Sequence, residues 1–437
     1  MINLKTSITR GLASLLGTLI LLSSTLLNLA VAKDYLIKNA TVHTAGQAGV
    51  LKNTDILISD GFIMELGKNL VVGRSTEVID AKGKDVTPGL INANTQLGLV
   101  EINAASQSVD HTTSQKGVGA SFNIAPAINF RSTLIPQNRI NGLTRAIVVP
   151  GFGNSIFAGS SSAIALFSDM TGMLSENVAQ HVVYGIGGAE FNGGSRAAAY
   201  MALDKALNDA NFLRHNRNRF DPGFESHFSL SIDDLDALKP VLEKKIPLIV
   251  HANRSDDILR MIALAKKHNI RIAIQGASEA WVVANEIARA KVPVIIDPIL
   301  NLPGSFSSLS TRIDAAAILH DSGVKLVFIG KDWQSTHNGY LVRQSAGNAV
   351  SHGLPAEEAL KAMTINTAEV FGIKNYGQIK VGMEADVVIW DGDPLEVTTN
   401  AEQVFIKGLK QPMVSRATRL RDRFWDLNDK KNKAYVK

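Results

Sequence analysis

The stretch Val86-Thr-Pro-Gly-Leu-Ile-Asn-Ala-Asn-Thr-Gln-Leu-Gly98 decides the fold of this chain. The apolar and β-branched residues over 85–91 predict a strand. Two amide side chains, Asn94 and Gln96, follow that strand directly. The sequence therefore predicts a strand that ends in side chains able both to donate and to accept hydrogen bonds.

Further along the chain, apolar strand patterns alternate with helical ones. Strands are expected at 246–252, 271–275, 292–296 and 325–330, and helices at 256–268, 277–290, 312–322 and 341–352. Ser255 is expected to cap the first of these helices. Four such units predict an α/β fold in which helices cover a parallel sheet. A (β/α)8 TIM barrel of about 250 residues fits the length of the chain better than an open sheet.

The two ends of the chain have a different, all-β pattern. Strands are expected at 35–43, 55–59 and 62–66, and again at 385–390 and 404–407. An Asp60-Gly61 turn between the second and third of these predicts a hairpin. We expect the two ends to form the halves of one small sheet domain.

The first half of the barrel is less distinct. Strands are expected at 85–91 and 144–149, but strands three and four have no clear pattern. Residues 103–129 and 185–195 are expected to be long loops. Gly159-Ser-Ser-Ser162 is also expected to be a loop, because it lacks the Gly-x-Ser-x-Gly frame of a nucleophile turn.

Composition excludes several classes of protein. The chain has 437 residues, of which 45% are hydrophobic and 19% charged, so it is neither disordered nor a coiled coil. It has no Cys, which excludes a disulfide, a thiolate metal site and a Cys nucleophile. The formal net charge of +5 is not gathered on one basic face, which argues against nucleic acid as a partner.

The first 32 residues predict a signal peptide. Lys5 and Arg10 precede an uncharged run over 11–31, which closes with Ala30-Val31-Ala32, a small-x-small cleavage pattern. Cleavage before Lys33 would leave the mature chain periplasmic or secreted, with no membrane attachment. The alternative is a transmembrane anchor, because the run nearly reaches the ~20 residues that span a bilayer.

The stretch 86–98 resembles the first-strand signature Pro-Gly-Leu-Ile-Asp-x-His-x-His of the amidohydrolase superfamily of metal-dependent hydrolases, to which imidazolonepropionase-like enzymes belong. Residues 376–394 are similar to the re-entry strand of that superfamily, Gly-x-Ile-x-x-Gly-x-x-Ala-Asp-x-Val. The resemblance implies a TIM barrel over 86–375, inserted in a small composite β-sandwich domain that both termini form, over 33–85 and 376–414. Residues 415–437 are expected to be a charged helix or tail.

The resemblance also indicates which ligands this chain lacks. The two His of the first strand map onto Asn94 and Gln96, and the His of strand six maps onto Gln275. An amide oxygen is a weaker zinc ligand than an imidazole nitrogen. The His of strand five and the Asp of strand eight are retained as His251 and Asp332. One weakly bound zinc ion, or none, is the expectation.

The resemblance assigns roles to these residues. Asp332 is expected to be the general base and a metal ligand, and His251 to bind metal or to polarise a substrate carbonyl. His337 is expected to reach the mouth of the barrel from a loop, as is His111. Alternatives remain open, because Asp332 also fits a helix N-cap and His251 a hydrogen-bonded core histidine.

Two functions follow from these residues. The first is hydrolysis of a carbon–nitrogen bond in a small cyclic amide, amidine or peptide-like substrate, as the resemblance implies. The second is binding of a polar small molecule without catalysis, since three amides at Asn94, Gln96 and Gln275 can bind a substrate that they cannot activate. The sequence leaves open whether the chain forms a homo-oligomer.

Overall fold

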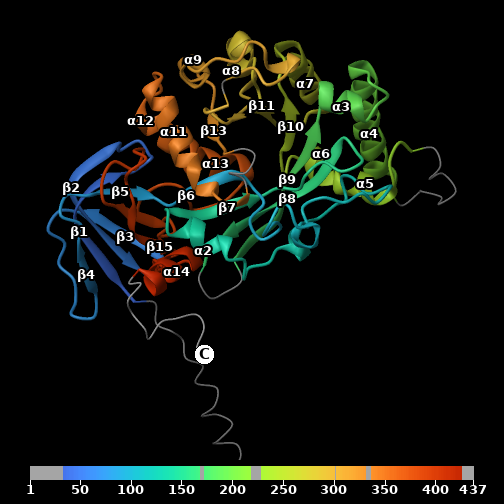
Figure 1. Ribbon diagram of the computed structural model, residues 1–437. Helices are drawn as coiled ribbons and strands as arrows, with labels where there is room; N and C mark the ends of the chain where they lie inside the picture. The colour runs from blue at the N-terminus through green and yellow to red at the C-terminus, as the bar shows by residue number, and fades with distance from the viewer. Residues whose placement is uncertain (1–32, 168–171, 218–227, 301, 331–335, 426–437) are drawn as a thin grey trace, which may run out of the picture.

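The computed structural model describes residues 33–167, 172–217, 228–300, 302–330 and 336–425 (Figure 1). The predicted signal peptide over 1–32 and the candidate base Asp332 lie outside the described residues. Within the described part, no helix is both long and apolar enough to cross a membrane.

Eight strands form the barrel, and neighbours in the chain are neighbours in the sheet from β6 to β13. They are β6 (Leu90–Thr95), β7 (Leu143–Val148), β8 (Phe157–Ala165), β9 (Met173–Val183), β10 (Leu248–Ala252), β11 (Ile272–Gly276), β12 (Val294–Ile296) and β13 (Leu326–Phe328). The barrel and its insertion in a sheet from both termini are confirmed. Strands three and four, which had no sequence pattern, are β8 and β9.

One strand departs from the parallel arrangement. β8 runs antiparallel to both β7 and β9, whereas all the other neighbouring pairs are parallel. The connections on either side of β8 are short, and a parallel crossover needs a dozen or more residues. The expectation of a loop over Gly159–Ser162 is wrong, because these residues are buried inside β8.

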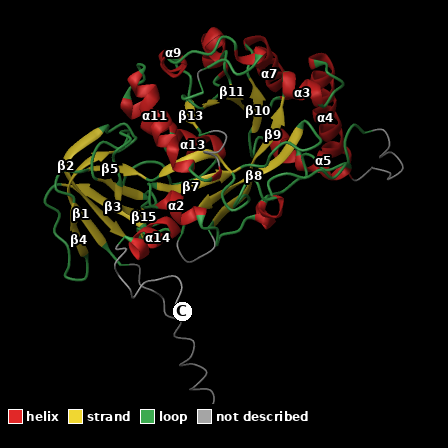
Figure 2. Cartoon of the chain, in the orientation of Figure 1, coloured by secondary structure: helices red, strands yellow, loops and turns green. Residues whose placement is uncertain are grey.

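Helices lie outside the barrel strands (Figure 2). They are α2 (Leu134–Arg139), α3 (Ile186–Glu190), α4 (Arg196–Asn216), α5 (Ile232–Ala237), α6 (Lys239–Leu242), α7 (Ser255–His268), α8 (Ala284–Ala290), α9 (Ala315–Asp321), α11 (Val342–Ser351), α12 (Ala356–Ala362), α13 (Ile365–Phe371) and α14 (Arg416–Phe424). Ser255 is the first residue of α7 rather than its cap, because its N–H and hydroxyl donate to Glu279.

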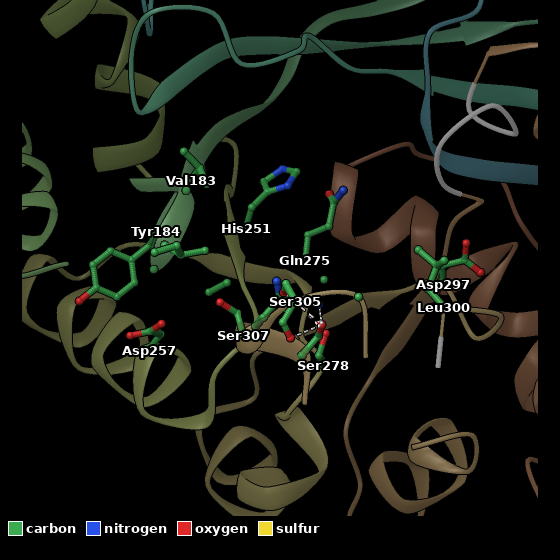
Figure 3. A pocket seen from close by; sticks show the side chains of 18 of the residues that line it. Val183, Tyr184, His251, Asp257, Gln275, Ser278, Asp297, Leu300, Ser305 and Ser307 are labelled. Atoms are coloured by element: carbon green, nitrogen blue, oxygen red, sulfur yellow. Dashed lines mark hydrogen bonds between the residues drawn. The ribbon is translucent and has the colours of Figure 1, made fainter. Parts of the chain in front are cut away.

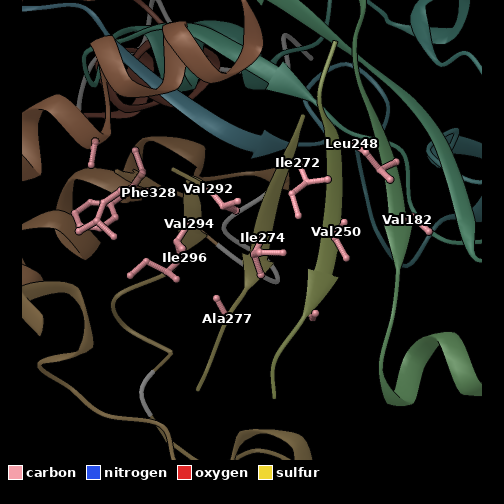
Figure 4. Close-up of a cluster of buried hydrophobic side chains, with 14 of the residues drawn as sticks. Val182, Leu248, Val250, Ile272, Ile274, Ala277, Val292, Val294, Ile296 and Phe328 are labelled. Atoms are coloured by element: carbon pink, nitrogen blue, oxygen red, sulfur yellow. The ribbon is translucent and has the colours of Figure 1, made fainter. Parts of the chain in front are cut away.

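Alternate residues of each strand enter two different cores, as the period of two in a strand requires. One set packs against the helices and includes Val250, Ile272, Ile274 and Phe328 (Figure 4). The other set fills the interior of the barrel with small and branched side chains: Ile91, Ala93, Ile147, Val149, Ala163, Ile249, Ala273, Ile295, Val327 and Ile329. The lower barrel is therefore a packed core, not a channel.

The second sheet combines both ends of the chain. Its order is β16 (Leu409–Lys410), β15 (Ala401–Ile406), β14 (Val387–Trp390), β5 (Asp85–Pro88), β1 (Tyr35–His43), β2 (Val50–Ser59) and β3 (Phe62–Gly67), and β4 (Glu77–Asp80) also pairs with β1. The N-terminal and C-terminal halves meet where β5 pairs with β14. The prediction that the two ends form one sheet is confirmed.

A buried ion pair joins this sheet to the barrel. Arg145 lies on β7, on the side that Ile147 and Val149 present to the barrel interior. Its Nε donates to Oδ2 of Asp386 over 2.9 Å and its Nη2 to Oδ1 over 3.1 Å, and Glu384 accepts a further bond. The guanidinium also lies 3.9 Å from the ring centre of Tyr376. The Ala-Asp pattern of the re-entry strand thus supplies the partner of a fully buried cation.

We predict that Arg145→Met lowers the free energy of unfolding by about 3–5 kcal/mol, because it leaves the buried carboxylate of Asp386 without its cation. Urea titration measures the change. Lys84→Met is the matched control, since it breaks an exposed pair with Glu402 in the same sheet and should cost less than about 1 kcal/mol. Adding Asp386→Leu to Arg145→Met should recover part of the loss. Equal losses in the two single variants would contradict the prediction.

A second ionic contact joins the two parts and depends on pH. His43 on β1 lies 2.9 Å from Glu357 at α12 and 2.8 Å from Asp85. The hydrogen bond to Glu357, opposed by burial and reinforced by Asp85, raises the pKa of His43 above its ordinary 6.5. A raised folded-state pKa stabilises the fold below pH 6.5, and this contribution is lost as the pH rises through the raised value.

We therefore expect His43→Gln to destabilise the chain by about 1–2 kcal/mol at pH 6 and by clearly less at pH 9. Urea titrations of both proteins at the two pH values give the comparison. The same difference at pH 6 and pH 9 would show that the charge on His43 contributes nothing.

Candidate functional site

A cavity of about 510 Å³ opens at the carboxyl ends of β9, β10, β11 and β12 (Figure 3). One wall is formed by residues 183–187, at the end of β9 and directly after it, and the other by residues of the loop 297–308, which follows β12. This end of a parallel barrel is where side chains from several strand ends meet. The cavity is the candidate functional site.

Two residues singled out from the sequence lie together between these walls. His251 on β10 and Gln275 on β11 are direct partners in the parallel register, and both line the cavity. Figure 3 shows the imidazole and the amide side by side. An imidazole transfers protons near neutral pH, and an amide both donates and accepts hydrogen bonds. The strand ends therefore combine a proton-transfer group with a group that can orient a substrate.

His251 is positioned by two further rings. Nδ1 of His181 on β9 lies 3.5 Å from Nε2 of His251, and the ring of Phe152 meets His251 edge-on at 4.9 Å between centres. His181 is fully buried, and its own Nε2 has no hydrogen-bond partner among the described residues. His181 and Phe152 together restrict the orientation of the His251 ring.

His181 was not among the residues that the sequence patterns identified as candidates. Burial, and then the charge on His251, hold the pKa of His181 well below its ordinary 6.5, so this imidazole is neutral at neutral pH. The sequence does contain an indication of this residue, the polar pair Gln180-His181 inside an apolar run. The pair could not be interpreted because strand four had not been assigned. Knowing that β9 is a barrel strand would have placed His181 beside His251.

Polar side chains of the cavity walls have local partners. Burial raises the pKa of Asp257 on α7, although Arg196, 3.5 Å away, acts in the opposite direction. Asp297 accepts a hydrogen bond from the N–H of Ile299 and so shapes the start of the β12–α9 loop. Ser278 donates to Asn253, which also lines the cavity.

The two amide side chains at the end of the first barrel strand do not line the cavity. Asn94 and Gln96 are half-buried at the end of β6, outside the set of residues that line the cavity. The pairing of β6 with β7 is irregular between Asn92 and Thr95, and such a bulge re-aims the side chains near it. Asn92 accepts from the N–H of Asn94 and donates to the carbonyl of Gly339.

The two loop histidines, His337 and His111, contact other parts of the chain and do not line the cavity. His337 is bonded to the carbonyl of Glu101 over 2.9 Å and to the hydroxyl of Thr336 over 2.8 Å. His111 packs against Gly151, and burial lowers its pKa. Neither lines the cavity, while Asp332 lies outside the described residues.

The metal-binding side chains among the described residues do not fit the zinc site that the resemblance implies. A catalytic zinc ion takes three protein ligands and a water molecule. His181 and His251 supply two imidazoles, and Gln275 beside them supplies an amide. Over the described ranges, no group of three or more His, Asp or Glu side chains is placed to hold a metal ion.

Comparison with known proteins gives one family. Residues 225–416 match the model of the amidohydrolase family. Amidohydrolase tasK of Hapsidospora irregularis is 22% identical over 400 residues, which cover 82% of this chain and 40% of that protein. The chain thus spans well under half the length of this relative.

Two solved structures share the fold. The amidohydrolase from Thermotoga maritima MSB8 is 24% identical with a TM-score of 0.76, and the match covers 86% of this chain and 99% of that one. Atrazine chlorohydrolase from Arthrobacter aurescens TC1, solved with zinc, is 17% identical with a TM-score of 0.52 and coverage of 89% and 98%.

Proposed function

Because the chain belongs to the amidohydrolase superfamily, we propose that it hydrolyses a carbon–nitrogen bond of a small cyclic amide, amidine or peptide-like molecule in the cavity at the ends of β9 to β12. The observation that carries this proposal is the pairing of His251 with Gln275 between the cavity walls. A proton-transfer group beside a hydrogen-bond donor is what hydrolysis of such a bond requires.

In the proposed reaction, water adds to the carbon of the C–N bond. His251 takes a proton from the attacking water and later gives it to the departing nitrogen, so that one proton is moved and none is gained or lost. The amide N–H of Gln275 donates to the oxygen, or the second nitrogen of an amidine, on which negative charge develops. His181 and Phe152 keep the His251 ring in the orientation that this exchange needs.

The resemblance assigns the proton transfer to Asp332, which would carry it out in place of His251 where His251 binds a metal ion. We propose that zinc, where bound, is held weakly by His251 and Asp332, because Asn94, Gln96 and Gln275 stand where imidazoles bind in the superfamily. A zinc ion bound there would lower the pKa of a coordinated water molecule.

The setting of this reaction is also part of the proposal. Cleavage after Ala32 would release a mature chain into the periplasm or the medium, where its partner is a small-molecule substrate. The absence of Cys suits an oxidising compartment, in which free thiols cross-link.

A second function has one observation in its favour. Three positions at which the superfamily has His carry amides in this chain, and Gln275 lines the cavity. Amides bind polar ligands through hydrogen bonds without activating water. The alternative is therefore a small-ligand-binding protein on the amidohydrolase fold.

An activity screen decides between the two. The mature chain is assayed against cyclic amides, amidines and blocked dipeptides, and we expect turnover of at least one class. His251→Asn should then lower kcat by about 100-fold or more. His320→Asn on α9, away from the cavity, is the matched control and should leave kcat unchanged.

Two outcomes would contradict this proposal, the first its assignment of His251 and the second hydrolysis itself. Full activity of His251→Asn would remove this residue from the reaction. Saturable ligand binding by a folded protein that turns over no member of the panel, with the affinity unaffected by a chelator, would establish the binding protein instead.

A further inference from the structure

The cavity has an apolar rim above its polar centre. Leu300 and Leu302 of the β12–α9 loop and Ile186 of α3 all line it. Their side chains are exposed to solvent by 44%, 80% and 49%. Large apolar side chains left exposed around a cavity mark a surface that a ligand covers.

The hydrogen-bonding groups of the strand ends lie between the two walls, and Asp297 lies beside Leu300 on one of these walls (Figure 3). Figure 3 shows His251 and Gln275 between the walls, with Leu300 on one side and Val183 and Tyr184 on the other. A ligand that spans the cavity therefore meets hydrogen-bonding groups at the strand ends and apolar side chains at the rim.

The loop that carries Leu300 and Leu302 has no charge, and hydrogen bonds hold its second half. Residues 298–311 include no Asp, Glu, Lys or Arg. Ser305 and Ser308 form a capping box, and the indole N–H of Trp281 donates to the carbonyl of Ser310 over 2.7 Å. Arg312 then lies over the Trp281 ring at 4.9 Å. Leu300 and Leu302 thus lie at the mouth of the cavity and are not buried in the core.

We propose that the cavity selects an amphipathic substrate: a neutral amide group at His251 and Gln275, attached to an aliphatic or aromatic side chain that covers Leu300, Leu302 and Ile186. The identity of the amide as the bond that is cut rests on the proposed function, whereas the selection for an apolar side chain does not. Covering one aliphatic side chain contributes about 1.5–3 kcal/mol, so the apolar contact is large enough to dominate selectivity.

Two probes separate the apolar contact from the polar one. N-acetyl-L-leucinamide and N-acetylglycinamide are both neutral and carry the same amides, but only the first has an isobutyl group. Calorimetric titration of the mature chain should show that the leucine probe binds about tenfold more tightly or better. Equal affinities, or no binding of either probe at millimolar concentration, would overturn the proposal.

Two single substitutions in the loop test which residues make the apolar contact. Leu302→Ser should reduce the preference for the leucine probe to about threefold or less and leave the affinity for the glycine probe unchanged. Phe306→Ser is the matched control, because Phe306 is on the same loop and 92% exposed but does not line the cavity. It should keep the full preference.

The outcomes distinguish the two proposals. An equal loss of preference in both variants would mean that the whole loop is a docking surface for a larger partner, and the proposed selectivity would be wrong. A clear preference in binding without turnover of either probe or of the substrate panel would leave the selectivity standing and refute the hydrolase.

Discussion

The ion pair between Arg145 and Asp386 is the contact on which the two parts of this molecule depend. It joins two segments that are far apart in the sequence. Asp386 lies next to the start of β14, near the C-terminal end of the chain, and Arg145 lies on barrel strand β7. Tyr376 completes the contact, since its hydroxyl donates to the carbonyl of Gly89, between β5 and β6. A buried charge without its partner costs several kcal/mol, so these distant segments can only be buried together.

The same contact determines where chemistry can take place. Arg145, Tyr376 and the small side chains of the barrel interior fill the lower part of the barrel. The cavity that His251 and Gln275 line lies at the carboxyl ends of the strands. The loops above them then decide what enters: one wall is the turn after β9, and the other is the uncharged loop after β12. In the proposed function, catalysis would therefore depend on the strand ends and selectivity on the loops.

The composite fold was predictable from the sequence, as were the strands that carry His251 and Gln275, because these strands have plain apolar patterns and neighbouring helices. The sequence did not reveal β8 and β9, since a long buried hairpin has no helix between its strands to mark the boundary. His181 was missed for the same reason. The positions of Asn94 and Gln96 depend on an irregular register at the end of β6. No local sequence pattern predicts this irregularity. The role of Asp332 remains a prediction, because this residue lies outside the described part of the chain.

Amides at Asn94, Gln96 and Gln275 stand where the superfamily has imidazoles, and we propose that this replacement weakens zinc binding. Zinc analysis of the mature chain, purified without a chelator and without a His tag, tests it most directly. We predict well below one zinc ion per chain, and an increase in Gln275→His, which would place a third imidazole beside His251 and His181. One zinc ion per wild-type chain that survives dialysis against a chelator would contradict the claim.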